Sequence, residues 1–235
     1  MKRQVLIVGY ANGLTGVKAD LDNYYRFFTS PVGGMWRADE ICVLENASTD
    51  EFLRHINFYQ VADLDYFVFV FCGHGASLQD EVVMEINDTD RPIKESEVTN
   101  VASRQLNIFD CCRKVESDVP YDILAEVKNF SQGGKIYGNV RQRYDWRIMQ
   151  AVEQSASLYA CSSGESAIGR NRGGDYSYHL LKAARNVSDA EEYKTISLCH
   201  YEACQHLEAM GSTQHPDYKL PRCVANQSLI LSIHP

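Results

Sequence analysis

The chain has 235 residues, of which 45% are hydrophobic, enough for one large domain with a buried core. Its formal charge of −8, from 23 basic and 31 acidic residues, and its lack of a basic tract argue against nucleic-acid binding. No apolar run reaches the roughly eighteen residues that a membrane span needs, so no membrane association is expected. The eight cysteines lie mostly in apolar runs without a secretory signal, which predicts reduced thiols in a cytoplasmic protein.

Strand-like and helix-like segments alternate through the first half of the chain. Short apolar, β-branched or aromatic runs predict strands at residues 5–8, 40–44, 66–72, 82–86 and 106–110. Helical spacing of apolar residues predicts a helix at 15–28, and the capping box from Ser48 to Glu51 begins another that ends near Phe58. A further helix is expected at 96–103, capped by Glu95 or Ser96.

The second half continues the alternation. Helices are expected at 121–129, 147–154, 176–186 and 191–210, strands at 157–161 and 228–233, and a turn-rich basic stretch at 131–147. Such alternation predicts an α/β fold with a mainly parallel sheet covered by helices on both faces. We expect a single domain over residues 1–235, in which regions 1–130 and 148–235 are joined by the 131–147 loop.

Two of the predicted strands end in chemically reactive side chains. One is followed by Gly73, His74 and Gly75, and the other by Cys112. Because the carboxyl ends of neighbouring parallel strands meet at one edge of a sheet, an imidazole and a thiol are expected side by side. A thiol is mostly protonated at neutral pH, and an adjacent imidazole converts it to the nucleophilic thiolate. The pair predicts a Cys-His hydrolase.

Strand alternation identifies Cys112, rather than Cys111, as the nucleophile. Side chains two residues apart on a strand share a face, so Asp110 and Cys112 point one way and Cys111 the other. By the same reasoning Cys72 lies on the face of His74. The N–H groups of Gly75 and Cys112 are then placed to hold a tetrahedral oxyanion.

These motifs, in this order, resemble those of the caspase-like cysteine peptidases, and metacaspases, paracaspases and their prokaryotic relatives more than animal caspases. Residues 73–75 resemble the His motif and residues 110–112 the metacaspase Asp-small-Cys pattern. Residues 16–21 resemble the first-loop motif, and residues 159–167 and 174–181 resemble the start of the small subunit. The resemblance implies a caspase-like α/β/α sandwich and a thiol protease acting on proteins or peptides.

The resemblance also implies a substrate preference. In metacaspases an acidic first-loop residue and the Asp two before the nucleophile form the floor of the S1 pocket. Here these are Asp20 and Asp110, flanked by Val17 and Cys72, and Leu14 stands where animal caspases have an arginine. Two carboxylates without an arginine favour Arg or Lys as the P1 residue.

The chain also departs from the metacaspase pattern. Arg113 replaces the His that often follows the cysteine, and Cys112 comes only 38 positions after His74. The missing length falls in the loop that supplies calcium ligands in many metacaspases. We expect no cofactor and leave calcium binding open, with candidate ligands that lack recognisable spacing: Asp80, Glu81, Asp88, Asp90 and Asp118.

In this family the segment after the nucleophile often carries an activating cleavage site. The 131–147 stretch offers four basic residues that suit the acidic pocket: Lys135, Arg141, Arg143 and Arg147. Because exposed loops are where proteolysis concentrates, the hypothesis is cleavage after one of them, by the enzyme itself or by an upstream protease. The alternative is an uncut, solvated loop.

Three other interpretations remain. A catalytically silent caspase-like adaptor would act by protein binding. A nucleotide- or flavin-binding protein would use the glycine-rich loop at residues 9–16, which lacks the G-x-G-x-x-G spacing and a P-loop lysine. His200 and Cys204, one helical turn apart, suit a metal site but lack standard zinc spacing, and we interpret them as ordinary helix residues.

Overall fold

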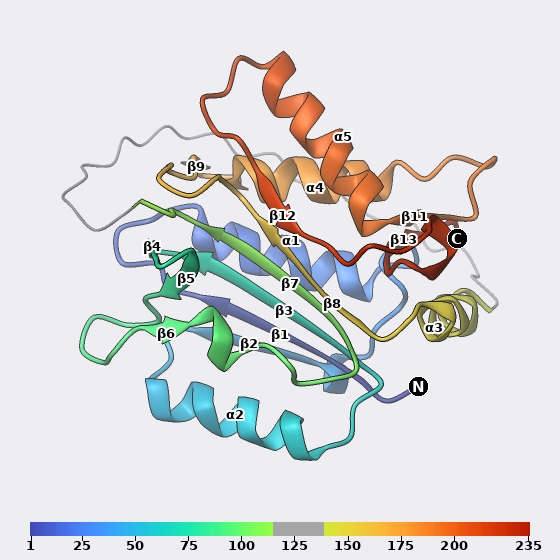
Figure 1. The fold of residues 1–235 in the computed structure, drawn as a ribbon, viewed down its shortest axis with the longest axis horizontal. Coiled ribbons are helices and arrows are strands. Elements are labelled where there is room, and N and C mark those ends of the chain that lie inside the picture. Colours follow the sequence, from blue (N-terminus) through green and yellow to red (C-terminus); the bar gives the residue numbers. More distant parts are fainter. Residues whose placement is uncertain (115–138) are drawn as a thin grey trace.

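A computed structural model describes residues 1–114 and 139–235, and its centre is a six-stranded sheet (Figure 1). The strand order is β12-β8-β7-β3-β1-β2. The bounds are Arg3–Gly9 for β1, Ile41–Glu45 for β2, Tyr66–Gly73 for β3, Arg104–Cys111 for β7, Gln154–Tyr159 for β8 and Asp217–Lys219 for β12. Every pairing in this sheet is parallel except that of β12 with β8, which confirms the mainly parallel sheet.

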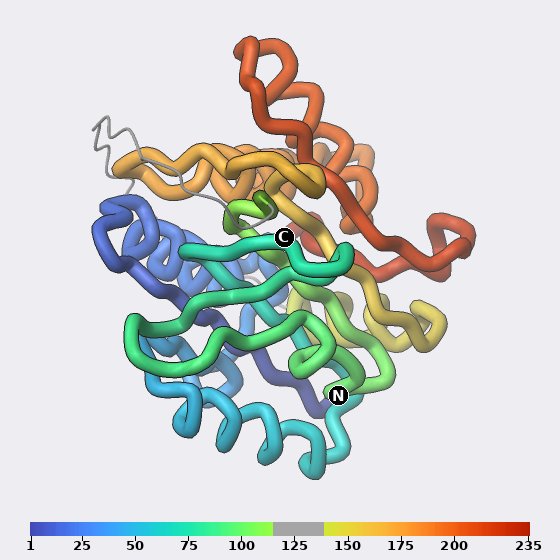
Figure 2. The backbone as a smooth tube through the Cα atoms, turned by 60° about the vertical axis from the view of Figure 1, so that its left-hand side comes forward, coloured from blue at the N-terminus to red at the C-terminus, as the bar shows by residue number. Residues whose placement is uncertain are grey.

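Helices and a small sheet cover the two faces of the central sheet (Figures 1 and 2). One core contains side chains of α1 (Val17–Thr29), α3 (Val140–Gln150), α4 (Asp175–Arg185) and α5 (Ile196–Ala209). The core on the opposite face contains side chains of α2 (Thr49–Val61) and of a three-stranded sheet formed by β4 (Gly75–Leu78), β5 (Glu81–Met84) and β6 (Ile93–Lys94). The α/β arrangement is therefore layered as predicted.

Short elements complete the described chain. Strand β9 (Gly169–Arg170) pairs with β10 (Gly173–Gly174), and β11 (Tyr193–Thr195) pairs with β13 (Ile230–Ile233). Single 3₁₀ turns lie at Ala38–Glu40, Glu95–Glu97 and Ala225–Gln227. The predicted final strand therefore exists as β13, in a two-stranded sheet apart from the central one.

The sequence of β3 shows why the core divides into two layers. Its small apolar residues, Val68, Val70 and Cys72, pack into the core that contains α1 and α4. The alternating aromatic residues, Phe67, Phe69 and Phe71, pack into the opposite core against α2 and the small sheet. A strand buried on both faces must be apolar throughout, which explains the continuous hydrophobic run.

The helix predicted at residues 96–103 is wrong. Only the turn Glu95–Glu97 is helical, and Asn100 has a left-handed φ of 62°. The following N–H groups of Val101 and Ala102 point to the Gln105 side-chain oxygen, 2.8 and 3.4 Å away. Side-chain bonds to the main chain thus replace the helical ladder in a segment with poor helix formers.

The prediction of a turn-rich basic stretch through residue 147, with a helix starting there, is also wrong. Helix α3 already begins at Val140, because Val140, Tyr144 and Ile148 form a buried stripe at i, i+4 and i+8. Three of the candidate processing residues therefore lie on a helix. Arg141 pairs with Glu40, with one N–O distance of 2.8 Å, and Arg147 is buried with its guanidinium 4.3 Å from the Tyr193 ring centre.

The remaining predictions concern the 121–129 segment, the start of the last helix and the cysteines. The helix at 121–129, Lys135 and Asp118 lie outside the described residues. The helix expected from residue 191 begins at Ile196, because the Thr195 hydroxyl caps it by accepting from the Leu198 N–H at 3.2 Å. All eight cysteines lie in the described part of the chain and none forms a disulfide, as predicted.

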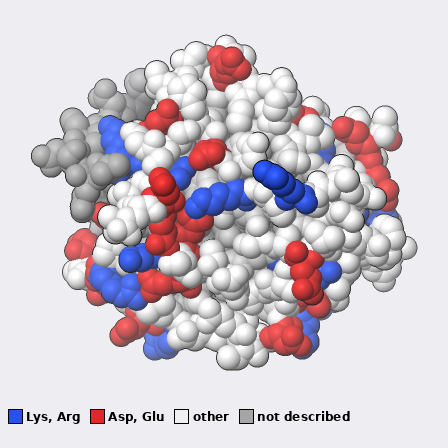
Figure 3. Space-filling view, in the orientation of Figure 1, with Lys and Arg blue, Asp and Glu red and all other residues white. Residues whose placement is uncertain are grey.

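The distribution of surface charge and the length of the helices relate to the predictions on nucleic-acid binding and membrane association. On the face shown in Figure 3, Lys and Arg side chains lie among Asp and Glu side chains rather than in one continuous patch. Among the described helices, none combines the length and the apolar character that crossing a bilayer requires.

Candidate active site

The two reactive strand ends lie next to each other at the edge of the sheet. In the β3–β7 register Cys72 is opposite Asp110 and Gly73 is opposite Cys111, so His74 and Cys112 follow directly on neighbouring strands. Cys111 packs into the core with α2 and is 2% exposed, whereas Cys112 is partly exposed beyond the strand. Cys111 and Cys72 thus pack into opposite cores, as strand alternation predicts.

His74 contacts the glycine-rich loop at residues 9–16, which the sequence analysis did not connect with the dyad. The Nε2 atom of His74 lies 3.0 Å from the main-chain oxygen of Asn12. A carbonyl oxygen only accepts, so Nε2 is the donor and carries the proton, which makes Nδ1 the basic nitrogen. The ring of Tyr10 meets the imidazole edge-on at a centroid distance of 5.8 Å. A main-chain carbonyl leaves no sequence signal, so this contact was missed.

Gly75 begins β4 immediately after His74 and packs against β7. A Cβ at this position would lie 2.6 Å from Cys111 Sγ and 2.9 Å from Cys111 Cβ, closer than such atoms approach. Glycine is therefore required for the close approach of this turn to the end of β7. The buried thiol of Cys111 thus has a packing role directly beneath the turn.

A pocket opens beside Cys112 and holds four of the predicted site residues. Val17, Asp20, Asp110 and Cys112 line it, whereas His74 and Gly75 do not. Cys72, the other predicted wall residue, does not line the pocket and is 1% exposed in the core that contains α1. The remaining lining comes from strand ends and loops: Gly13, Leu14, Thr15, Gly16, Gly73, Cys111, Ala167, Gly169, Arg170 and Gly174.

Main-chain N–H groups from the start of α4 hold the two pocket carboxylates. Gly174 N–H donates to Asp20 Oδ2 at 2.8 Å, and Ser177 N–H donates to Asp110 Oδ2 at 3.0 Å. A Cβ on Gly174 would overlap the Asp110 carboxylate, so only glycine lets the chain pass here. These donors lie far from Asp20 and Asp110 in the sequence. The sequence therefore predicted the two carboxylates but not the N–H groups that bind them.

Burial makes both carboxylates weak acids. It raises the pKa of Asp20 well above the ordinary value, and the nearby Asp110 raises it further against the opposing Gly174 hydrogen bond. Burial likewise raises the pKa of Asp110 to about 6, although hydrogen bonds from Ser177 lower it. In the absence of a cation the pocket therefore tends to retain protons.

A third buried carboxylate nearby, that of Asp175, has cationic partners. Asp175 is 1% exposed, and Arg170 Nε lies 2.7 and 2.8 Å from its two oxygens. Arg172 adds a contact at 3.3 Å. By contrast, the partners that the described residues give to Asp20 and Asp110 are uncharged, and Asp20 Oδ1 has no hydrogen-bond partner among those residues.

Three other thiols near the site are weak acids because they are buried. Burial raises the pKa of Cys72 and of Cys111 well above the ordinary thiol value, and raises that of Cys161 to about 12. Neighbouring carboxylates or thiols raise them further. Each of the three is expected to stay protonated at neutral pH, whereas Cys112 is partly exposed and lines the pocket.

Candidate metal ligands do not converge in the described part of the chain. No group of three His, Cys, Asp or Glu side chains there is close enough to hold a metal ion. His200 instead lies in a buried helix contact, with Nδ1 2.7 Å from the Tyr176 hydroxyl and Nε2 3.4 Å from Cys204 Sγ.

Comparisons with known proteins agree with this architecture. The family model described as "Caspase domain" matches residues 2–222. The crystal structure of caspase-1 from Spodoptera frugiperda has a similar fold, with a TM-score of 0.58 and 14% identity over 93% of this chain and 86% of that one. No curated protein sequence matches this chain. The predicted caspase-like fold is confirmed, and the chain belongs to the caspase domain family.

Proposed function

We propose that this chain is a cysteine endopeptidase of metacaspase type that cleaves after Arg or Lys, with Cys112 as nucleophile and His74 as its base. The main support is the pair of buried carboxylates beside Cys112, which lack a cationic partner among the described residues. A buried carboxylate is costly unless a positive charge or sufficient hydrogen bonds compensate it. A P1 guanidinium or ammonium group supplies that charge, and Asp20 Oδ1 is the acceptor left for it.

The chemistry follows from the placement of the two strand ends. His74 takes the thiol proton at Nδ1 while Cys112 Sγ attacks the carbonyl carbon of the P1 residue. The N–H groups of Gly75 and Cys112 stabilise the oxyanion of the tetrahedral intermediate. His74 then protonates the leaving amine as the C–N bond breaks, and water hydrolyses the resulting thioester.

Replacing each residue of the dyad tests the assignment. Cys112→Ala and His74→Ala should each abolish cleavage of Arg-containing peptides while the circular dichroism spectrum stays unchanged. Cys111→Ala is the matched control and should retain substantial activity, because its thiol packs into the core. An inactive, folded Cys111→Ala protein would contradict the choice of nucleophile. A native enzyme that cleaves no peptide would instead favour the silent adaptor.

The acidic pocket predicts the substrate preference. Profiling on a peptide library should show cleavage after Arg and Lys, and Asp20→Ala should lower kcat/KM for these peptides by about 100-fold or more, since a buried cation loses its partner. Asp22→Ala, on the exposed side of the same helix, is a matched control that should have little effect. Efficient cleavage after Asp by the native enzyme would refute the acidic pocket.

Asp110→Asn should have opposite effects on activity and stability. Because the pKa of Asp110 is raised to about 6, the folded state binds this proton more tightly than the unfolded state. The free energy of unfolding therefore falls as pH rises from about 4 to about 6, and removing the charge should restore about 2 to 3 kcal/mol at pH 7.5. Chemical denaturation at pH 4 and 7.5 measures this gain.

The same protonation predicts the pH dependence of binding. As pH falls through about 6, Asp110 becomes neutral and KM for an Arg peptide should rise. In Asp110→Asn the KM should be high throughout and lose that inflection. A variant that binds Arg peptides normally, or that gains no stability at pH 7.5, would argue against an uncompensated charge in the pocket.

Helix α3 restricts activating cleavage. A peptidase binds an extended substrate, and a cut after Arg141, Arg143 or Arg147 requires unfolding of this helix. We therefore expect mass spectrometry of the active protein to find no cut after these three residues. Lys135, the remaining candidate, lies outside the described residues. Cys112→Ala, analysed in parallel, separates self-cleavage from cleavage by an upstream protease, and an early cut after Arg147 would contradict the prediction.

A further inference from the structure

We infer that residues 214–217, which do not line the pocket, position the site in two ways: Gln214 positions the pocket wall, and Asp217 positions the nucleophile through Arg113. This inference rests on the proposed peptidase function. The segment leads into β12, the edge strand of the central sheet. Its role is one of positioning, because neither side chain faces the pocket.

The side-chain amide of Gln214 closes a loop that forms part of the pocket. It is 2% exposed, its Nε2 donates to the Ala160 oxygen at 2.6 Å, and its Oε1 accepts from the Ile168 N–H at 3.0 Å. One amide therefore fixes both ends of the loop at residues 160–168. Ala167, within this loop, lines the pocket, and its carbonyl oxygen lies 4.0 Å from Cys112 Sγ. Loss of the amide should loosen the wall that a P1 side chain contacts.

Asp217 acts on the other side of the site, through the residue that follows Cys112. Arg113 is 3% exposed, and one of its guanidinium nitrogens lies 3.1 Å from Asp217 Oδ2 and 3.2 Å from the Cys161 oxygen. The guanidinium also stacks 4.3 Å from the ring centre of Tyr159. A buried guanidinium that loses its carboxylate must find a new partner, and the backbone of the nucleophile moves with it.

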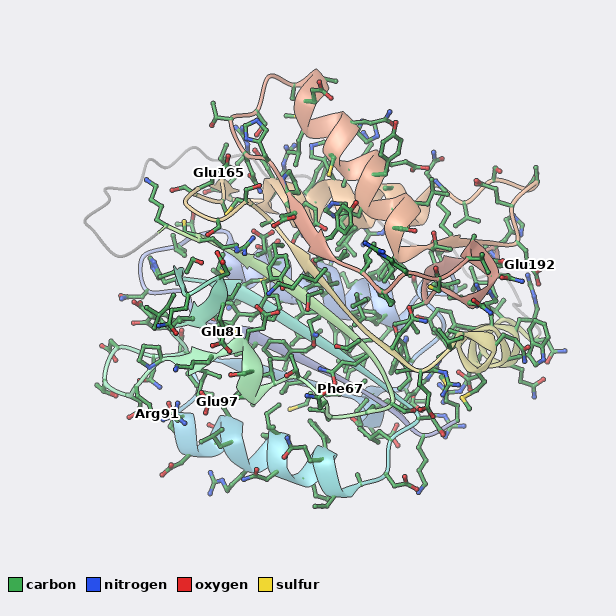
Figure 4. The ribbon with its side chains drawn as sticks, in the orientation of Figure 1. Phe67, Glu81, Arg91, Glu97, Glu165 and Glu192 are labelled. Carbon is green, nitrogen blue, oxygen red and sulfur yellow. The ribbon has the colours of Figure 1, made fainter. Side chains whose placement is uncertain are left out.

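The main chain of Arg113 strengthens this link. Its N–H donates to the Glu165 oxygen at 2.9 Å, and its carbonyl oxygen accepts from the Gly164 N–H at 2.8 Å. Glu165, labelled in Figure 4, lies in the loop that Gln214 closes. The nucleophile and the pocket wall are thus joined to each other and are both held by the same segment.

The two contacts predict different kinetic effects on an Arg peptide. Gln214→Met keeps the length of the side chain but removes both hydrogen bonds, and should raise KM about tenfold with little change in kcat. Asp217→Ala should lower kcat about tenfold with little change in KM, and Asp217→Asn, which keeps an acceptor oxygen, should recover part of the loss. Thr213→Ala is the matched control next to this segment, because Thr213 is exposed.

A second measurement does not depend on peptide cleavage. The rate at which iodoacetamide alkylates Cys112, followed by peptide mass spectrometry, should fall in Asp217→Ala and stay near the native rate in Thr213→Ala. Benzamidine, a cationic probe for the pocket, should protect Cys112 less well in Gln214→Met. Thermal melts show whether each variant is folded.

The outcomes separate this inference from the proposed function. A native protein that cleaves no peptide overturns the proposed function, while the alkylation rates still decide the role of Asp217. If Gln214→Met and Asp217→Ala change KM and kcat in the same proportion, or lower only the melting temperature, the segment has a purely structural role and the inference is wrong.

Discussion

The parallel pairing of β3 with β7 is the constraint on which the rest of the site depends. It places Gly73 opposite Cys111, so that the residues beyond both strands meet at one edge of the sheet. A shift of one residue would turn Asp110 and Cys112 to the opposite face, because side chains alternate along a strand. The aromatic residues of β3 are buried against α2. They resist such a shift, because it would turn their side chains to the opposite face of the sheet. Core packing thus sets the geometry of the reactive groups.

The electrostatics of the pocket depend on which carboxylates already have cationic partners. Asp175 is neutralised by Arg170 and Arg172, which ties the β9–β10 hairpin to the start of α4. Asp20 and Asp110 receive only main-chain and hydroxyl hydrogen bonds from the described residues. Of the three neighbouring acids, Asp175 therefore has cationic partners, and the other two have none among the described residues. Buried carboxylates without cationic partners lower the free energy of unfolding of the protein when no substrate is bound. Functional sites are commonly destabilising in this way.

Predictions from the sequence succeeded where the signal was local. Period-two alternation identified the strands and the opposite directions of Cys111 and Cys112, since both follow from backbone geometry. It failed for α3, where a run of arginines concealed the buried stripe of Val140, Tyr144 and Ile148. Contacts made by distant main-chain groups were also missed. The Asn12 carbonyl and the Ser177 N–H belong to loops whose position depends on the whole fold, and main-chain groups carry no residue-specific signal.

The surroundings of the thiols near the site support the proposal that Cys112 is the nucleophile. Cys72, Cys111 and Cys161 lie within a few residues of the site in sequence or across the sheet, and burial raises the pKa of each. Their thiolates are therefore suppressed by the same core that holds β3 and β7 together. Cys112 lies one residue beyond β7, where the strand leaves the core and enters the pocket. In the proposed function, the boundary between strand and loop, rather than the identity of the residue, thus favours Cys112 over the buried thiols.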